Sequence, residues 1–150
     1  MKTLIIGSVG SGKTYYSKKL SDLSGIYRYE LDSIVHDDFY NRRRTDEEIK
    51  NIINSINNNN AWIIEGVLRE NLEYLLDYSD KIILLDTNYN VRKRRIILRY
   101  IKQKLGIEKC NYKPSMQMLK QMLIWNKKFE YQKKALIIKL DKYYDKLQIV

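Results

Sequence analysis

Near its beginning the chain reads Gly7-Ser8-Val9-Gly10-Ser11-Gly12-Lys13-Thr14. This stretch fits the pattern G-x-x-x-x-G-K-[ST], which is typical of a loop that binds phosphate groups. An apolar run at residues 2–6 precedes it and predicts a buried strand, and residues 15–23 predict a helix. Strand, loop and helix in this order are the context that the pattern requires, so we expect the loop to hold the phosphates of a nucleotide.

The residue types of the loop suit this chemistry. Its glycines tolerate positive φ angles and let a ligand approach the backbone closely. Successive amide hydrogens then form an anion-binding nest at the start of the following helix. Lys13 supplies a positive charge for the β- and γ-phosphates, and the Thr14 hydroxyl is a ligand for Mg²⁺. We therefore predict that ATP and Mg²⁺ bind here, with nucleotide contacts from Gly7, Val9, Gly10, Ser11, Gly12, Lys13, Thr14 and Tyr15.

Length and composition bound the remaining possibilities. A chain of 150 residues, 44% hydrophobic and 31% charged, is typical of one soluble domain with its own core. No apolar run approaches the roughly 20 residues of a membrane span, and no signal peptide is visible. Cys110 is the only cysteine, which excludes an internal disulfide and favours the cytoplasm. We expect a single cytoplasmic domain over residues 1–150, with no membrane partner.

The positive charge of the chain is concentrated in one segment. The net charge is +10, which suits a polyanionic partner, although a generally lysine-rich surface would explain it equally well. Residues 92–104 contain no acid, and on a helix with about 100° per residue four of their cations form one stripe beside an apolar stripe. Such a helix either directs cations at phosphate or presents a solvated face. The four cations are Arg92, Arg95, Arg99 and Lys102.

Strand-like and helix-like stretches alternate along the chain. Because this alternation is typical of parallel βαβ units, it predicts a three-layer α/β/α sandwich with ligands at the carboxyl ends of its strands. The expected strands are Lys2–Ile6, Tyr27–Leu31, Ala61–Glu65, Lys81–Asp86 and Ala135–Leu140. The expected helices after the first are one that begins with the capping box Thr45-Asp46-Glu47-Glu48, then Arg69–Leu76, Val91–Leu105 capped by Asn90, Ser115–Lys128 and Asp141–Leu147.

Three acids follow the expected strands. Asp32 is the first candidate for a base or an acceptor-binding group, and Glu65 for holding the metal through water or contacting the acceptor. Asp86 is a weaker candidate, because Asp86-Thr87-Asn88 also suits a plain turn. The basic run at residues 42–44 is either a clamp for an acidic acceptor or an exposed turn.

These stretches together resemble a known family. The loop, Leu31-Asp32, Trp62-Ile63-Ile64-Glu65-Gly66, Leu84-Leu85-Asp86 and the arginine-rich helix are similar to the small adenylate-kinase-like P-loop kinases, in particular the DNA topology modulation proteins. The resemblance extends to about residue 129. It implies an adenylate-kinase-like P-loop NTPase fold with a five-stranded parallel sheet of order 2-3-1-4-5. It also implies an acceptor-binding segment at about residues 33–60 and a mobile lid at about residues 88–130.

The resemblance also assigns roles to individual residues. Arg92, Arg95 and Arg99 match the lid arginines, and Arg69 would contact the phosphate of the acceptor. The stretch Glu65-Gly66-Val67-Leu68-Arg69 matches the Asp-Gly-x-Pro-Arg stretch of nucleoside monophosphate kinases in spacing. Glu65 and Leu68 depart from that pattern, which weakens the case for a nucleoside monophosphate as acceptor.

Two functions follow as hypotheses. The first is an ATP-dependent kinase that moves the γ-phosphate of ATP to a nucleoside, a nucleotide or another small acceptor. Its expected catalytic residues are Lys13, Asp32, Arg95 and Arg99, its acceptor-binding residues Asp32, Glu65, Gly66 and Arg69, and its metal ligands Thr14 and Glu65. The second is a nucleic-acid-binding regulator that uses the loop only as a switch; a polynucleotide 5′-hydroxyl kinase would combine the two. A regulatory GTPase is disfavoured, since the guanine-reading Asn-Lys-x-Asp is absent from the sequence.

Overall fold

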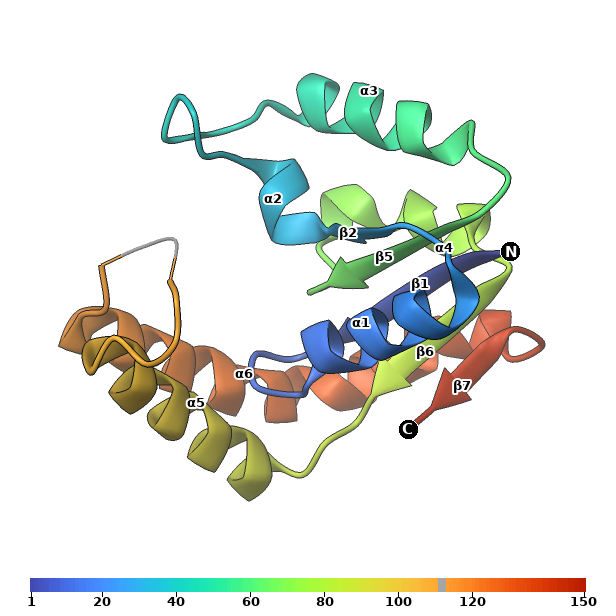
Figure 1. Cartoon of the computed structure of the whole chain (residues 1–150). Coiled ribbons are helices and arrows are strands. Elements are labelled where there is room, and N and C mark those ends of the chain that lie inside the picture. Colours follow the sequence, from blue (N-terminus) through green and yellow to red (C-terminus); the bar gives the residue numbers. More distant parts are fainter. Residues whose placement is uncertain (111–112) are drawn as a thin grey trace. The chain divides into compact units, whose positions relative to one another are not determined.

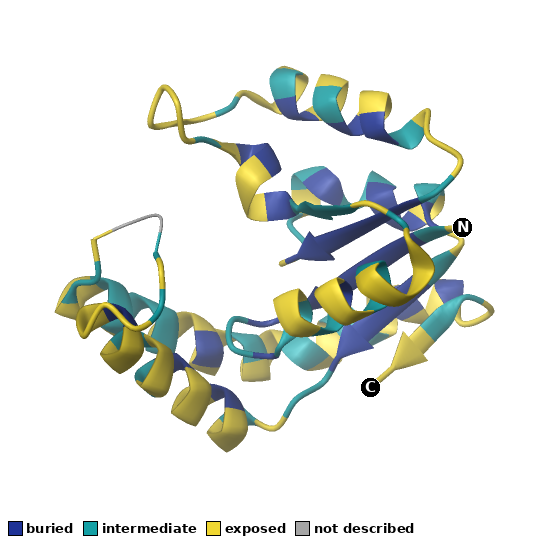
Figure 2. Ribbon diagram, viewed as in Figure 1, coloured by how far each residue is buried: buried dark blue, intermediate teal, exposed yellow. Residues whose placement is uncertain are grey.

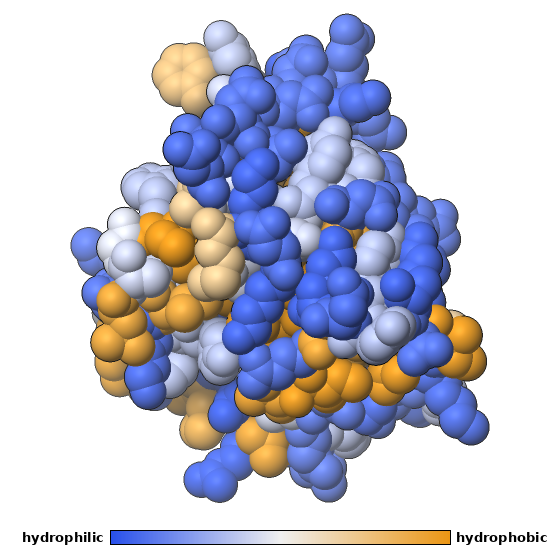
Figure 3. Space-filling view, turned by 90° about the vertical axis from the view of Figure 1, so that its right-hand side faces the viewer, coloured by the Kyte–Doolittle hydropathy of each residue, from blue (hydrophilic) through white to orange (hydrophobic). Residues whose placement is uncertain are grey.

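The computed structural model describes residues 1–110 and 113–150, and the chain forms two compact units (Figure 1). The sheet unit comprises Met1–Gly7, Gly12–Leu85 and Tyr143–Val150, and the helical unit comprises Ser8–Ser11 and Asp86–Lys142. The predicted lid, residues 88–130, includes residues 111–112, which lie outside the described part. Hydrophilic side chains cover most of the face drawn in Figure 3, with hydrophobic patches between them, in agreement with a charged fraction of 31%.

The sheet unit is built on a parallel five-stranded sheet of order β2-β5-β1-β6-β7. Its central strands are continuous apolar runs because helices cover both of their faces, and Figure 2 shows these strands buried. In the register, Leu4 of the first strand lies between Ile64 and Ile82 of its neighbours. The strands are β1 (Lys2–Gly7), β2 (Arg28–Glu30), β5 (Trp62–Gly66), β6 (Lys81–Leu85) and β7 (Leu147–Ile149).

Four of the five expected strands are confirmed, and the fifth is wrong. Ala135–Leu140 is the last part of helix α6 (Met116–Leu140), so the strand order differs from the prediction in its last member. The edge position belongs to β7, in a segment for which a short helix was predicted; only the single turn η2 (Asp141–Tyr143) is helical there. A three-residue apolar run fits a helix as well as a strand, and no Gly or Pro interrupts residues 116–140.

Helices cover both faces of the sheet. From β1 the chain crosses the sheet to the edge strand β2, and it then runs back across the sheet in the opposite direction, through β5 to β6. Right-handed crossovers therefore place α1 on one face and α3 and α4 on the other (Figure 1). The α1 face of the core contains Ile5, Ile63, Ile83 and Leu85, with Tyr16, Leu20 and Ile26 packed against them. The helices are α1 (Lys13–Ser24), α2 (Leu31–Val35), α3 (Asp46–Asn57) and α4 (Tyr74–Tyr78), with the 3₁₀ turn η1 (Glu70–Leu72).

The start of α3 is capped as the sequence predicts, and the end of α1 is capped by a glycine. The Thr45 hydroxyl accepts a bond from the Glu48 amide at 3.2 Å, and the Glu48 carboxylate accepts one from the Thr45 amide at 2.7 Å, which confirms the capping box. Gly25 ends α1 in the left-handed conformation, with φ 69°. Beside the end of α3, the fully buried Trp62 donates from its indole nitrogen to Asn57 Oδ1 at 3.3 Å.

The helical unit is an antiparallel pair, α5 (Tyr89–Lys104) and α6. Arg92, near the start of α5, contacts Asn126 and Glu130 in the middle of α6, whereas Tyr100 and Gln103 line a small cavity with residues 115–122. The cap of α5 is Asn88 instead of Asn90: Asn88 Oδ1 accepts from the Asn90 amide at 2.9 Å. On α6, Trp125 is 47% exposed.

Over residues 1–110 and 113–150, every helix is too short or too polar to cross a lipid bilayer.

Candidate active site

The loop between β1 and α1 has the backbone of an anion-binding nest. Gly10 and Gly12 have φ angles of 75° and 95°, in the left-handed region that favours glycine. The Ser11 amide donates to the Ser8 carbonyl at 3.2 Å and closes a turn. Gly12 is the N-cap of α1 and has no side chain with which to cap the first turn, an arrangement that suits the binding of an anion at this helix start.

Glu65 joins the loop from the neighbouring strand. Thr14, in the first turn of α1, donates from Oγ1 to Glu65 Oε1 at 2.7 Å. Glu65 lies at the carboxyl end of β5 and is 4% exposed. Arg28 Nη1, at the start of β2, lies 3.3 Å from the same carboxylate oxygen and 2.7 Å from Glu30 Oε1. The paired strands β2 and β5 and the first turn of α1 thus bring a hydroxyl, a buried acid and a cation into one contact group.

The electrostatics of Glu65 favour a positively charged ligand. Burial raises the pKa of its carboxyl above the ordinary value of 4.5, and the charge of Glu30 also raises this pKa. The hydrogen bond from Thr14 and the charges of Lys13 and Arg28 oppose this pKa shift without cancelling it. A cation beside the carboxylate would compensate its lost hydration.

The residues present fit a magnesium ion bound together with a nucleotide. Thr14 and Glu65 are hard oxygen ligands already in contact, which suits Mg²⁺. Within the described residues, no group of three or more His, Cys, Asp and Glu side chains could hold a metal ion. An ion at Thr14 and Glu65 would therefore need oxygens from bound phosphates and water, which is the usual arrangement for this metal.

Asp32 and Arg69 form a pair outside this group. Asp32 lies on α2, directly after β2, and its side chain is 76% exposed. Arg69 Nη2 lies 3.1 Å from Asp32 Oδ1. Gly66 lets α2 approach β5, because a Cβ at residue 66 would lie only 2.5 Å from Leu31 Cβ. The predicted acceptor residues Asp32 and Arg69 are thus side by side, and Gly66 positions them through Leu31.

Gly66→Ala is expected to displace Leu31 and to lower the free energy of unfolding by about 2 kcal/mol, the usual effect of overpacking a core. Urea denaturation measures this change. Val67→Ala, at the exposed neighbouring residue, is the control and should alter the free energy of unfolding by less than about 0.5 kcal/mol. Equal stability of the two variants would show that α2 does not depend on Gly66.

Arg95 and Thr87 hold the middle of the loop within the helical unit. Arg95 Nη1 donates to the carbonyls of Gly10 at 3.3 Å and Ser11 at 3.1 Å, and Thr87 Oγ1 donates to the Ser11 carbonyl at 2.9 Å. In a trans peptide the carbonyl and the following amide point in opposite directions. Fixing the Ser11 carbonyl therefore turns the Gly12 amide away from Arg95 and Thr87.

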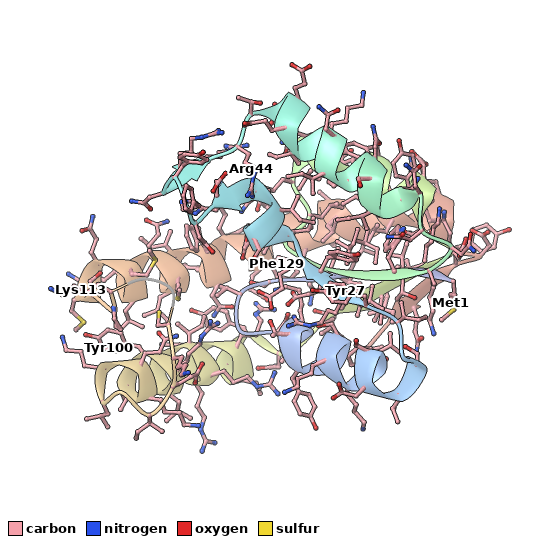
Figure 4. The ribbon with its side chains drawn as sticks, turned by 45° about the horizontal axis from the view of Figure 1, so that its top comes forward. Met1, Tyr27, Arg44, Tyr100, Lys113 and Phe129 are labelled. Carbon is pink, nitrogen blue, oxygen red and sulfur yellow. The ribbon has the colours of Figure 1, made fainter. Side chains whose placement is uncertain are left out.

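Arg92 is directed into the protein. Its side chain is fully buried, with Nε donating to Asn126 Oδ1 at 2.6 Å and Nη1 to the Thr87 carbonyl at 2.7 Å. Nη2 pairs with Glu130, and the guanidinium lies over the Phe129 ring at 4.9 Å (Phe129 is labelled in Figure 4). These contacts connect α5 to α6.

The other predicted residues are more peripheral. Arg99 is half exposed and lies 3.4 Å from Glu108, and Tyr15 is exposed. Val9 is half-buried in the loop. Asp86 accepts a bond from Lys133 at 2.9 Å. The nucleotide-binding, catalytic and acceptor-binding roles of all these residues stay predictions.

Sequence reasoning missed Arg28, Thr87 and the partners of Arg92. Arg28 stands between two tyrosines on a predicted strand. The one signal that could have identified it as a site residue was a charge next to a strand end. Thr87 belongs to a stretch that resembles a plain turn. Asn126 and Glu130 are spaced i, i+4 on α6, so they share a face, but their shared partner lies 34 and 38 residues away in sequence.

Comparisons with known proteins bear on the fold. No protein-family model and no curated protein matches the chain. Among solved structures, the deoxyadenosine kinase from M. mycoides with bound dATP matches with a TM-score of 0.57 and 16% identity, over 100% of this chain and 90% of that one. The same enzyme with the products dCMP and a flexible dCDP bound gives a TM-score of 0.51 at 16% identity, with the same coverage. The predicted α/β fold with a parallel five-stranded sheet is thereby confirmed as similar to the fold of these kinase structures.

Proposed function

We propose that the chain is an ATP-dependent phosphotransferase that moves the γ-phosphate of ATP to a nucleoside, a nucleotide or another small acceptor. The observation that carries this proposal is the Thr14–Glu65 hydrogen bond, which joins the phosphate loop to a buried acid at the end of β5. The fold similarity to two deoxyadenosine kinase structures supports it. The DNA topology modulation family remains a finer hypothesis that rests on the motifs alone.

In this proposal the loop binds the donor. The first-turn amides of α1 and the Lys13 ammonium hold the β- and γ-phosphates, and the Thr14 hydroxyl and Glu65 hold the metal. Magnesium, when bound with ATP, neutralises charge on the phosphate oxygens. Arg95 orients the loop by donating to the loop carbonyls. Arg99 is exposed and supplies a cation for the phosphates. The buried Arg92 anchors α5.

The acceptor binds beside Asp32 and Arg69. A hydroxyl group that attacks phosphorus must be oriented and must lose its proton, for which an exposed carboxylate such as Asp32 is suited. Arg69 holds that carboxylate in place and offers its remaining donors to an anionic group of the acceptor. We place this acceptor site in the predicted segment at residues 33–60 together with Asp32, and the lid at residues 88–130.

The test is phosphoryl transfer from γ-labelled ATP with Mg²⁺, measured against nucleosides, their 5′-monophosphates, small hydroxylated metabolites and 5′-hydroxyl oligonucleotides. We expect a labelled product with at least one small acceptor, and ATP binding in calorimetry. Absence of ATP binding in the presence of Mg²⁺ would refute the proposal.

The raised pKa of Glu65 gives a pH prediction. In the ligand-free protein the folded state holds the Glu65 proton more tightly than the unfolded state, so stability falls as pH rises above 4.5 through the folded-state pKa. Glu65→Gln removes this contribution. The melting temperature of the variant should equal that of the wild type near pH 4 and exceed it near pH 8, while phosphoryl transfer is lost.

The paired measurement is thermal melting of both proteins across this pH range without nucleotide. A variant that is less stable than the wild type near pH 8 would show that the contacts of Glu65 with Thr14 and Arg28 outweigh the burial of its charge.

The second candidate function is binding of nucleic acid. It is favoured by exposed cations on α5, namely Lys93, Arg94, Arg95, Arg99, Lys102 and Lys104, and by the net charge of +10. Oligonucleotide affinity should then fall steeply with salt, with a slope set by the number of phosphates contacted. Absence of a mobility shift at low salt would exclude this candidate.

A further inference from the structure

A small hairpin follows α2 and carries two exposed aromatic rings. Its strands are β3 (His36–Asp37) and β4 (Arg42–Arg43), paired antiparallel. At the tip, Phe39 is 87% exposed and Tyr40 is 67% exposed. The two rings stand edge to face with centroids 4.9 Å apart. Figure 1 shows this hairpin beyond α2, on the side of the sheet where β2 and β5 end.

Polar bonds hold the hairpin in shape. Asp37 Oδ1 accepts from the amides of Phe39 and Tyr40 at 3.1 and 3.2 Å. Arg44, labelled in Figure 4, lies 3.4 Å from Asp37 Oδ2 and donates to the carbonyls at the end of α2, those of Ser33, Ile34 and His36. The tip is therefore fixed by its backbone and carboxylate contacts while its rings stay in water. Ordered apolar side chains kept in water in this way indicate a binding surface.

The charges of the hairpin disfavour a polynucleotide as the occupant. Arg42 makes two bonds to Glu48, at 2.8 and 2.6 Å, and the hydrogen bond from Arg42 lowers the pKa of Glu48 to about 2. His36 lies 3.1 Å from Asp38, and Arg44 pairs with Asp37. A phosphodiester backbone needs cations that are available to neutralise its phosphates, and most of those on the hairpin have acidic partners.

The size of the patch disfavours a protein partner. Two side chains expose far less than the roughly 800 Å² per partner that a stable protein interface buries. One of the two perpendicular rings can stack on the face of a planar heterocycle while the other contacts its edge, because stacking on an aromatic side chain requires only a π-face. A small aromatic ligand is the occupant that fits both the size and the charge of this surface.

We propose that Phe39 and Tyr40 form the stacking surface for the base of the acceptor, so that the acceptor is a nucleoside or a nucleotide. This inference rests on the proposed function and narrows its substrate class. Asp32 and the hairpin belong to one continuous segment, because α2 contains Asp32 and ends at the carbonyls that Arg44 holds. In this arrangement Asp32 and Arg69 hold the reacting end of the acceptor, while the rings hold its base.

The experiment compares a Phe39→Ser, Tyr40→Ser double variant with the wild type and with Tyr144→Ser, an equally exposed tyrosine of the same unit, outside the hairpin. We expect the KM for nucleoside acceptors to rise about tenfold or more in the double variant, the usual effect of removing a stacked ring. The kcat at saturation and the ATP affinity should stay within about twofold. Phe39→Tyr should retain the wild-type KM, and Tyr144→Ser should leave every constant unchanged.

Several outcomes would overturn the inference. A double variant with the wild-type KM for every nucleoside would contradict it. A wild-type protein that phosphorylates only acceptors without an aromatic ring would also contradict it, but would leave the kinase proposal standing. If no acceptor is phosphorylated at all, the kinase proposal fails, and calorimetric titration with deoxyadenosine, deoxycytidine and thymidine decides the inference alone. Absence of binding, or equal binding by the double variant, would then refute it. Loss of oligonucleotide binding in the double variant, with nucleoside binding retained, would also overturn it in favour of a polynucleotide.

Discussion

Lys13→Ala is expected to lower the rate of phosphoryl transfer about 100- to 1,000-fold while the protein stays folded. The lysine places its charge where negative charge develops on the transferred phosphate, and removing one such contact has typically had an effect of this size. Its removal should not unfold the chain, because Lys13 is half-buried at the start of α1 and outside the core. A coupled assay of ADP release and circular dichroism measure the two parts of this prediction.

Lys19→Ala is the matched control, since Lys19 lies on the exposed face of the same helix and should change neither rate nor structure. A Lys13→Ala variant with the wild-type rate would mean that the loop does not bind the reacting phosphates. A variant that unfolds would be replaced by Lys13→Met, which keeps the apolar part of the side chain.

Glu130→Ala is expected to lower the free energy of unfolding of the helical unit by about 3 kcal/mol. The substitution leaves the fully buried Arg92 guanidinium without its carboxylate partner, and an uncompensated buried charge is strongly destabilising. The Arg92 carbonyl would lie 2.9 Å from a Cβ at residue 10, so a looser α5 should also weaken ATP binding. Urea denaturation and ATP calorimetry measure both effects.

The control for this prediction is Glu108→Ala. It breaks another Arg–Glu pair of the same unit, that with Arg99, in which both side chains are about half exposed. Exposed pairs contribute less than about 1 kcal/mol. If the two variants have the same stability, the Arg92–Glu130 contact does not stabilise the helix pair.

Local patterns predicted much of the fold. The loop motif and the capping box at Thr45 each depend on neighbouring residues in the sequence, and the structure has both. Residues 135–140 were assigned to a strand because three apolar residues in a row are short enough for either element. The absence of a helix-breaking residue upstream favoured the helix, and only pairing with β6 shows that Leu147–Ile149 is the edge strand.

The candidate site was predictable where it is contiguous in sequence. Lys13 and Thr14 follow from the motif, and Glu65 from its place after an apolar run. The contacts that hold these residues are long-range: Arg28 reaches Glu65 across 37 residues, and Arg95 reaches the Ser11 carbonyl across 84. Arg92 shows the same limit, because helical periodicity placed it in a cationic stripe, whereas its burial depends on Asn126 and Glu130 of another helix.

The two tryptophans of the chain, Trp62 and Trp125, are divided between the compact units, one fully buried and one about half exposed. Each unit therefore contains its own intrinsic fluorophore, and the emission of the shielded indole should be blue-shifted relative to that of the solvated one. Replacing either tryptophan by phenylalanine gives a protein with a single optical reporter. Acrylamide quenching and denaturant titrations of these two proteins would show whether the units lose their structure in one transition or in two.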